Sequence, residues 1–182
     1  MFALINVAAF QVGWFSSVLG GANNLPWVGP LVVLAVVAFH IRSAKRPSSE
    51  LLLILCCAVI GGIFDSILVA NNWVSYFSGF VGANLAPYWI ITMWALFATT
   101  LNVSLRWLRK MPLVAVAFGA VGGPLTYLAG QKLGGIVLVD SFAALVALAI
   151  GWGVMMPLLM KLAESLDGMT TSSRSSALET TS

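Results

Sequence analysis

Charged residues are scarce in this chain: Asp, Glu, Lys and Arg together make up 8% of its 182 residues, whereas they make up about a quarter of a typical soluble domain. So little charge excludes an ordinary water-soluble domain. The hydrophobic share of 60% and the mean hydropathy of +0.98 indicate an integral membrane protein, whose first partner is the lipid bilayer.

Side chains that bind metals or carry out redox chemistry are also few. The chain has a single histidine, His40, and two cysteines, Cys56 and Cys57, which are adjacent within an apolar run. One histidine cannot form a bis-histidine site, and adjacent cysteines have neither a metal-ligand spacing nor the geometry of a structural disulfide. Because phosphate-loop and nucleophile-elbow motifs are missing too, we expect no metal, no other cofactor and no catalytic residue, and we expect His40 to be an interfacial residue.

Six apolar segments account for almost the whole length. Each is bounded by turn-forming or charged residues and is close to the span of a bilayer, about 20 residues. They cover residues 2–20, 27–42, 51–71, 88–108, 112–131 and 141–161. The sequence therefore predicts an all-α integral membrane bundle of six transmembrane helices over residues 1–164, followed by a disordered cytoplasmic tail over 165–182, whose Ser and Thr content cannot support a core. The apolar N-terminus lacks the basic region of a cleavable signal, so we expect it to be retained as the first span.

The basic residues predict the orientation of these helices. Those predicted to lie on one side of the bundle are Arg42, Lys45, Arg46, Arg106, Arg109, Lys110, Lys161 and Arg174. Only Lys132 falls on the other side. By the positive-inside rule this places both termini in the cytoplasm, an N-in/C-in topology in the bacterial inner membrane. The net charge of +3 is thus explained by topology, and no nucleic-acid partner is expected.

One carboxyl group, Asp65, lies deep within the third apolar segment. On a helix it shares a face with small residues such as Ala58 and Gly61, which let a neighbouring helix approach closely, so Asp65 is expected to face the bundle interior. No basic residue is predicted at its depth, in the outer half of the membrane. Its partners should therefore be neutral donors. An intramembrane acid is a candidate functional group, and the alternative is a hydrogen-bonded acid that only sets helix packing.

The candidate binding cavity is formed by polar and aromatic residues predicted near Asp65. They are Gln11 and Trp14 in the first segment, Trp89 and Asn102 in the fourth, and Tyr127 in the fifth. Trp94 is a further candidate hydrogen-bond donor. The fifth segment also has a Gly119/Gly123 packing motif and Pro124, which predicts a kink or a break.

Several stretches together resemble a known family. They are Asn6 and residues 10–15, 26–30, 65–66, 87–89, 96–102, 104–108 and 119–127. They are similar to a bacterial inner-membrane family catalogued as domain-of-unknown-function family 2878. The resemblance covers nearly everything before the tail, and it implies a small multi-spanning protein of the cytoplasmic membrane without an assigned activity.

Three hypotheses on function follow from these residues. In the first, the cavity around Asp65 binds a small or amphipathic, lipid-like molecule for transport or lipid handling. In the second, the protein is a non-catalytic accessory or assembly subunit whose glycine-rich fifth segment docks on a membrane-protein partner. In the third, it is a membrane-embedded enzyme acting on lipid, with Asp65 and Asn102 as acid/base and orienting groups.

Overall fold

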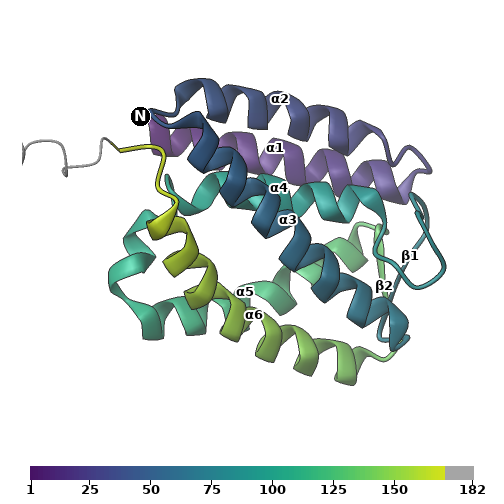
Figure 1. Ribbon diagram of the computed structural model, residues 1–182. Coiled ribbons are helices and arrows are strands. Elements are labelled where there is room, and N and C mark those ends of the chain that lie inside the picture. Colours follow the sequence, from purple (N-terminus) through teal and green to yellow (C-terminus); the bar gives the residue numbers. More distant parts are fainter. Residues whose placement is uncertain (171–182) are drawn as a thin grey trace, which may run out of the picture.

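The computed structural model describes residues 1–170 of the chain, and this part is a helical bundle (Figure 1). Its six α-helices are α1 (Phe2–Ala22), α2 (Val28–Ser43), α3 (Pro47–Ala70), α4 (Tyr88–Leu101), α5 (Pro112–Lys132) and α6 (Ser141–Ser165). A 3-10 helix, η1 (Arg106–Lys110), follows α4, and two short strands, β1 (Val74–Tyr76) and β2 (Ile136–Leu138), follow α3 and α5. The predicted helical class is confirmed.

Four of the helices, α1, α3, α5 and α6, are long and apolar enough to cross a membrane. Helix α2 has 16 residues, the length predicted for it, and α4 has 14, fewer than the 21 residues of the predicted segment 88–108. The fourth predicted segment, 88–108, is wrong at its end, because the helix stops at Leu101. There the hydroxyls of Thr99 and Thr100 donate to the carbonyls of Leu96 and Phe97. Side-chain bonds of this kind compete with the backbone ladder.

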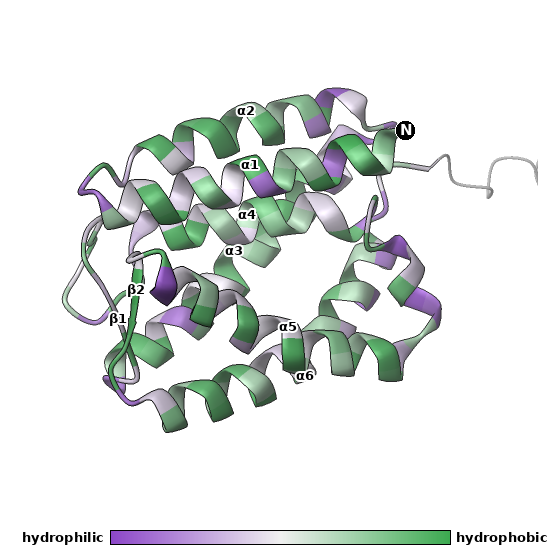
Figure 2. Cartoon of the chain, turned by 180° about the vertical axis from the view of Figure 1, so that it is seen from behind, coloured by the Kyte–Doolittle hydropathy of each residue, from purple (hydrophilic) through white to green (hydrophobic). Residues whose placement is uncertain are grey.

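Helix α4 is the central element of the bundle. Its buried residues are Trp89, Ile90, Trp94, Leu96, Ala98, Thr99, Thr100 and Leu101. It packs against α1, α2 and α3, while α1 with α2 and α5 with α6 form two helical hairpins. The core thus lies along α4, and the outward faces of the other helices carry most of the exposed apolar side chains (Figure 2).

The loop after α3 and the loop after α5 pair with each other at the end of the bundle opposite the N-terminus. Strands β1 and β2 are antiparallel, with Val74 opposite Leu138 and Tyr76 opposite Ile136. Both strands bury their first and last residues, because side chains two apart in a strand point to the same face. The pairing turns Tyr76 toward Asp65 on α3.

The predicted break at Pro124 does not occur, since α5 continues through it to Lys132. A membrane helix tolerates a proline when neighbouring groups satisfy the freed backbone.

The basic stretches meet at one end of the bundle. The loop between α2 and α3 and the helix η1 both contact residues that follow α6, as the backbone bonds from Lys45 and Arg46 to Gly168 and the ion pair from Arg106 to Asp167 demonstrate. The N-terminus lies at this same end, and the strands lie at the opposite end (Figure 1). Of the predicted tail, residues 165–170 are described and Asp167 and Gly168 are buried; residues 171–182 lie outside the described part.

Candidate functional site

Asp65 is fully buried, with 0% of its surface exposed, and three neutral donors surround its carboxylate. The Trp94 indole donates to Oδ2 at 2.6 Å and the Tyr76 hydroxyl donates to Oδ1 at 3.1 Å. The Tyr127 hydroxyl also donates to Oδ1. The expectation of neutral partners at Asp65 is therefore confirmed.

Three elements, β1, α4 and α5, supply these donors, and a glycine on α3 allows one of them to approach closely. Gly61, one turn before Asp65 on α3, lies directly beneath the Trp94 ring, so that a Cβ atom there would overlap the indole. Trp94 comes from α4 and Tyr127 from α5. Trp94 and Tyr127 were among the donors predicted from the sequence, whereas Tyr76 was not, because only the pairing of β1 with β2 directs it inward.

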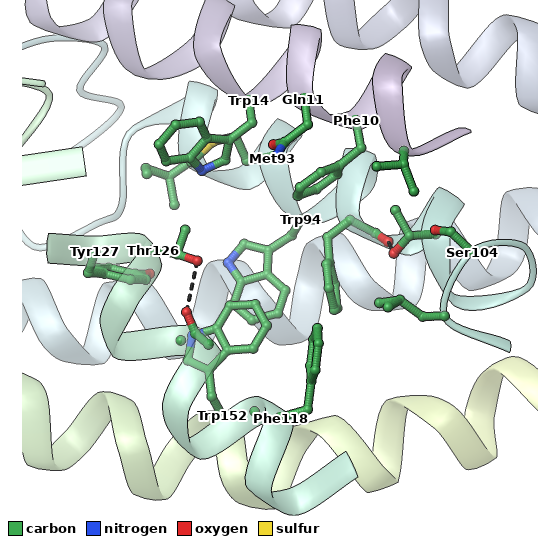
Figure 3. A pocket seen from close by; sticks show the side chains of 18 of the residues that line it. Phe10, Gln11, Trp14, Met93, Trp94, Ser104, Phe118, Thr126, Tyr127 and Trp152 are labelled. Atoms are coloured by element: carbon green, nitrogen blue, oxygen red, sulfur yellow. Dashed lines mark hydrogen bonds between the residues drawn. The ribbon is translucent and has the colours of Figure 1, made fainter. Parts of the chain in front are cut away.

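A cavity of about 320 Å³ lies beside Asp65, between α1, α4 and α5 (Figure 3). Four of the six residues predicted for the cavity line it: Gln11, Trp14, Asp65 and Tyr127. The rest of the lining is mainly apolar and aromatic and includes Phe10, Met93, Phe97, Phe118 and Trp152. The structure thus places most of the predicted set around a single cavity, which is partly open to the surface.

The other two predicted residues lie elsewhere. Trp89 is fully buried, and its indole donates to the carbonyl of Ser78 at 3.0 Å, in the loop after β1. Asn102 donates to Glu50 Oε1 at 2.6 Å, at the basic end of the bundle. Trp89 was assigned by its predicted depth, which does not define the side of the helix that a residue occupies. Asn102 lies at the other end of the bundle from Asp65, because its partner Glu50 is at the start of α3.

Two indole N–H groups of the cavity wall have no hydrogen-bond partner within the described chain. They belong to Trp14 and Trp152, and both nitrogen atoms are buried. Trp152 stacks on Trp94 with ring centroids 4.5 Å apart and nearly parallel planes. In Figure 3 these rings lie at the Tyr127 and Thr126 end of the cavity, and Ser104 lies at the far end. Trp14 and Trp152 lie on opposite sides of the cavity, with Trp94 between them.

The far end of the cavity is closed by a polar contact between distant segments. The Ser104 hydroxyl donates to Asn6 Oδ1 at 2.7 Å, and the Asn6 amide donates to the carbonyl of Thr99 at 3.1 Å. Asn6 thus holds α1 against the end of α4, the interhelical role that polar residues often have in membranes.

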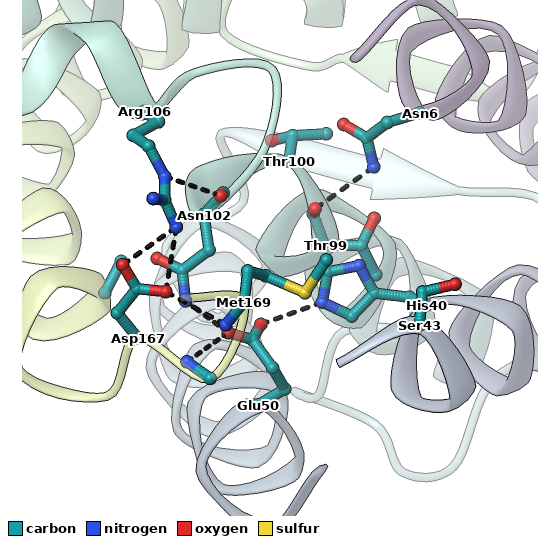
Figure 4. A network of polar contacts seen from close by, with 12 residues as sticks. Asn6, His40, Ser43, Glu50, Thr99, Thr100, Asn102, Arg106, Asp167 and Met169 are labelled. Carbon is teal, nitrogen blue, oxygen red and sulfur yellow. Dashed lines mark hydrogen bonds and ion pairs between the residues drawn. The ribbon is translucent and has the colours of Figure 1, made fainter. Parts of the chain in front are cut away.

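A second polar network occupies the basic end of the bundle (Figure 4). Glu50 has 0% of its surface exposed, and its carboxylate accepts from Asn102 and from the backbone N–H of Gly168 at 2.7 Å. His40 Nε2 lies 2.8 Å from Glu50 Oε2. His40, for which the sequence predicts a place at the membrane interface, is only 2% exposed, because it is the partner of this buried acid.

Asp167 joins the chain that follows α6 to this network. Arg106 Nη2 donates to both of its carboxylate oxygens at 2.8 Å, and Arg109 Nη1 donates at 3.0 Å. Burial opposes ionisation of Asp167, but the hydrogen bonds from Arg109 and the Met169 amide and the charge of Arg106 outweigh it and hold the pKa below its usual range. Sequence reasoning missed Asp167, because it lies in a stretch with no apolar pattern.

The separation of the two networks limits the chemistry available. Asn102 is bonded to Glu50, and Glu50 is 15 residues before Asp65 on α3, about 22 Å at the rise of an α-helix. Asp65 and Asn102 therefore do not form the acid/base pair that the enzyme hypothesis required. Among residues 1–170, no group of three or more His, Cys, Asp or Glu side chains is arranged to hold a metal ion.

Comparison with known proteins places the chain in a family. No curated protein and no solved structure matches it. The family described as "Protein of unknown function (DUF2878)" matches residues 3–158, which include every helix as far as the middle of α6 and the whole cavity. The chain therefore belongs to this family of proteins of unknown function, as its resembling stretches predicted.

Proposed function

We propose that the protein crosses the bacterial cytoplasmic (inner) membrane six times and binds a small, amphipathic, lipid-like molecule in the cavity beside Asp65, for transport or for lipid handling. The observation that carries this proposal is the cavity itself. It combines a mainly apolar lining with a few polar side chains, among them Gln11, Asp65 and Thr126, the pattern typical of sites that take a mostly apolar ligand and orient it by a few polar groups.

The membrane placement is supported by the distribution of charge. The basic loop between α2 and α3 and the helix η1 lie at the same end as the N-terminus, which suits an even number of crossings with this end in the cytoplasm. Helix α4, at 14 residues about 21 Å long, is too short to span alone. It is enclosed by its neighbours, and non-helical backbone at membrane depth is tolerated where protein covers it.

The route into the cavity is between α1 and α5. These helices flank it, and the exposed lining residues belong to them: Val7 and Gln11 on α1, and Phe118 and Thr126 on α5. In a bilayer this side faces lipid, so an amphipathic molecule can enter sideways without crossing the polar ends.

Filling the cavity is the most direct test. A Cβ atom added at Gly122 would meet nothing within 4 Å, and Gly122 lines the cavity, so Gly122→Leu should occupy the binding space without a clash. Ala117→Leu, on an exposed part of the same helix outside the lining, is the matched control. The protein is purified in mild detergent, and co-purifying small molecules are identified by mass spectrometry. We expect the wild type and Ala117→Leu to retain the same molecule and Gly122→Leu to lose it.

Retention of that molecule by Gly122→Leu at the wild-type level would refute the proposal. Asp65→Leu is a poorer test, because it would leave the Trp94, Tyr76 and Tyr127 donors buried without an acceptor, and such losses destabilise the fold by themselves.

The Gly119/Gly123 motif does not support the accessory-subunit hypothesis, because both glycines pack against another helix of the same chain. Gly119 and Gly123 of α5 face α6, where added Cβ atoms would overlap the Trp152 backbone and ring. The glycines thus serve packing within the chain, and they do not present a docking face to another protein.

A further inference from the structure

Gln11 lies near the middle of α1, and its side chain is exposed. It is nine residues after the start of the helix at Phe2 and 11 before its end at Ala22, about 14 and 16 Å at the rise of an α-helix. Helix α1 is long and apolar enough to cross a membrane. In a bilayer, Gln11 therefore lies near the centre of the hydrocarbon core, where no water is present to hydrogen-bond its amide.

The chain supplies no partner for this amide. Among residues 1–170, no hydrogen bond joins the Gln11 side chain to another group. Asn6 on the same helix differs, because its amide bonds to the Thr99 carbonyl and to the Ser104 hydroxyl. A polar group without a partner is costly in an apolar medium. Gln11 thus requires a hydrogen-bonding group from another molecule.

The Gln11 amide is within reach of a molecule in the cavity. Gln11 lines the cavity at its mouth between α1 and α5, and its oxygen and nitrogen atoms point into the cavity in Figure 3. Because the side chain is exposed, a ligand reaches it without any change in the wall. Thr126, on the α5 side of the mouth, is also exposed. Its hydroxyl donates to the Gly122 carbonyl at 2.8 Å, so its oxygen is left to accept.

The hydrogen-bonding groups of Gln11 define the polar group of the ligand. A glutamine amide has one accepting oxygen and two donating N–H groups, so it is satisfied by a group that both donates and accepts. A group that only accepts would leave the Gln11 oxygen unpaired. A charged group is costly at this depth, and the Asp65 carboxylate already accepts from three neutral donors. The ligand group is therefore neutral.

The size and lining of the cavity define the remainder of the ligand. Its volume of about 320 Å³ is at the lower end of the ~300–1,000 Å³ of typical ligand pockets, so it accommodates one chain and not a whole diacyl lipid. Phe10 lies on the Ser104 side of Gln11 (Figure 3), and the wall also includes Met93 and Phe118. This apolar wall suits an alkyl or isoprenoid chain.

We infer that the ligand is a neutral single-chain amphiphile whose polar group both donates and accepts hydrogen bonds, as a primary amide or a hydroxyl does, and that Gln11 binds this group at the mouth of the cavity. The inference rests on the proposed binding function, because it specifies the ligand class of the same cavity. Gln11 thereby distinguishes the ligand from the surrounding lipid chains, which have no polar group at this depth.

The test uses four probes with similar chains: decanamide, which donates and accepts; methyl decanoate, which only accepts; undecane, which does neither; and the cation decylammonium. Their binding to the protein in lipid nanodiscs is measured for the wild type and Gln11→Met, with empty nanodiscs as the blank for partition into lipid. Methionine keeps the length of the side chain and removes the amide. Gln131→Met, at an exposed position near the end of α5 outside the cavity lining, is the matched control, and thermal unfolding checks that each variant is folded.

We expect decanamide to bind the wild type most tightly, and Gln11→Met to weaken it at least about fivefold, the factor that corresponds to one neutral hydrogen bond of ~1 kcal/mol. Gln131→Met should bind decanamide as the wild type does, and undecane binding should be the same in all three proteins. Equal decanamide affinity in the wild type and Gln11→Met would overturn the inference. Tighter binding of methyl decanoate or decylammonium than of decanamide would overturn it as well.

The other possible partner of Gln11 is a helix of a second protein molecule, and native mass spectrometry distinguishes this case. Loss of an oligomer in Gln11→Met, with unchanged decanamide affinity, would assign Gln11 to a contact between chains and overturn the inference while the cavity proposal stands. The failure of the underlying proposal looks different. If no probe binds the wild type better than Gly122→Leu, the cavity is not a binding site and both proposals are refuted.

Discussion

Replacing Asp167 with asparagine should loosen the basic end of the bundle, where the chain after α6 is held to two other elements. Asp167 accepts from Arg106 through both carboxylate oxygens and from Arg109 through one. An asparagine keeps the shape and one carbonyl oxygen but turns an NH2 group toward a cation. The substitution therefore breaks two ion pairs and leaves two arginines without a counter-charge.

The magnitude follows from how far these partners are buried. The Arg109 and Asp167 side chains are 11% exposed and the Arg106 side chain is 33% exposed. Exposed ion pairs contribute at most about 1 kcal/mol, whereas removing one partner of a fully buried pair costs about 3–5 kcal/mol. A partly exposed pair lies between these limits, so we expect Asp167→Asn to lower the free energy of unfolding by about 2 kcal/mol.

For a chain of this length, such a change corresponds to a fall in Tm of roughly 4–8 °C. The measurement is thermal unfolding of the detergent-solubilised protein, followed by tryptophan fluorescence. Asp140→Asn is the control, because Asp140 is an exposed N-cap of α6 that accepts from the Ala143 N–H, and asparagine is an equally good cap. If Asp167→Asn lowers the Tm no more than Asp140→Asn does, the Asp167 network does not stabilise the fold and the reasoning is wrong.

Two further predictions follow. The Tm difference between the wild type and Asp167→Asn should depend on pH, because the pKa of Asp167 is held below its usual range in the folded protein. The stabilisation by Asp167 is complete at pH values above its pKa in the unfolded chain, about 3.9, and is lost as the pH falls through its lower pKa in the folded protein. A Tm difference that does not change with pH down to acid unfolding would contradict this. Gly61→Ala should destabilise the protein by about 3 kcal/mol through overpacking, because the added Cβ atom would overlap the Trp94 indole. Gly122→Ala is the control, and it should leave the Tm unchanged or raised, because a Cβ atom at Gly122 meets open space. Equal Tm values for the two alanine variants would contradict the packing at Gly61.

Asp65 illustrates what could be predicted from the sequence. Its place among apolar and small residues predicts a buried acid, and the lack of any basic residue at its depth predicts neutral partners; the structure confirms both. These arguments depend only on local helical periodicity and on the cost of burying a charge, which hold whatever the tertiary arrangement.

Glu50 illustrates what could not be predicted. It reads as an ordinary acid in the first turn of a helix, yet it is fully buried against His40, Asn102 and Gly168, which are 10, 52 and 118 residues away in the sequence. The prediction that Asn102 lines the cavity was wrong, because Asn102 bonds to Glu50 at the basic end of the bundle. Depth along a membrane is one coordinate, and a side chain's partners depend equally on the rotation of its helix and on which helices are neighbours.

The sequence by itself determined that this is a membrane-type helical protein, where its six helices lie to within a few residues except at the end of α4, and that Asp65 faces inward among neutral donors. These properties follow from composition and from periodicity, both of which act over a few turns of helix. Only the tertiary structure decided that α4 is the central helix, that β1 turns Tyr76 onto Asp65, and that Trp14 and Trp152 line one cavity. These depend on contacts between segments far apart in the chain, because side-chain donors find their acceptors in space and no local pattern encodes the pairing.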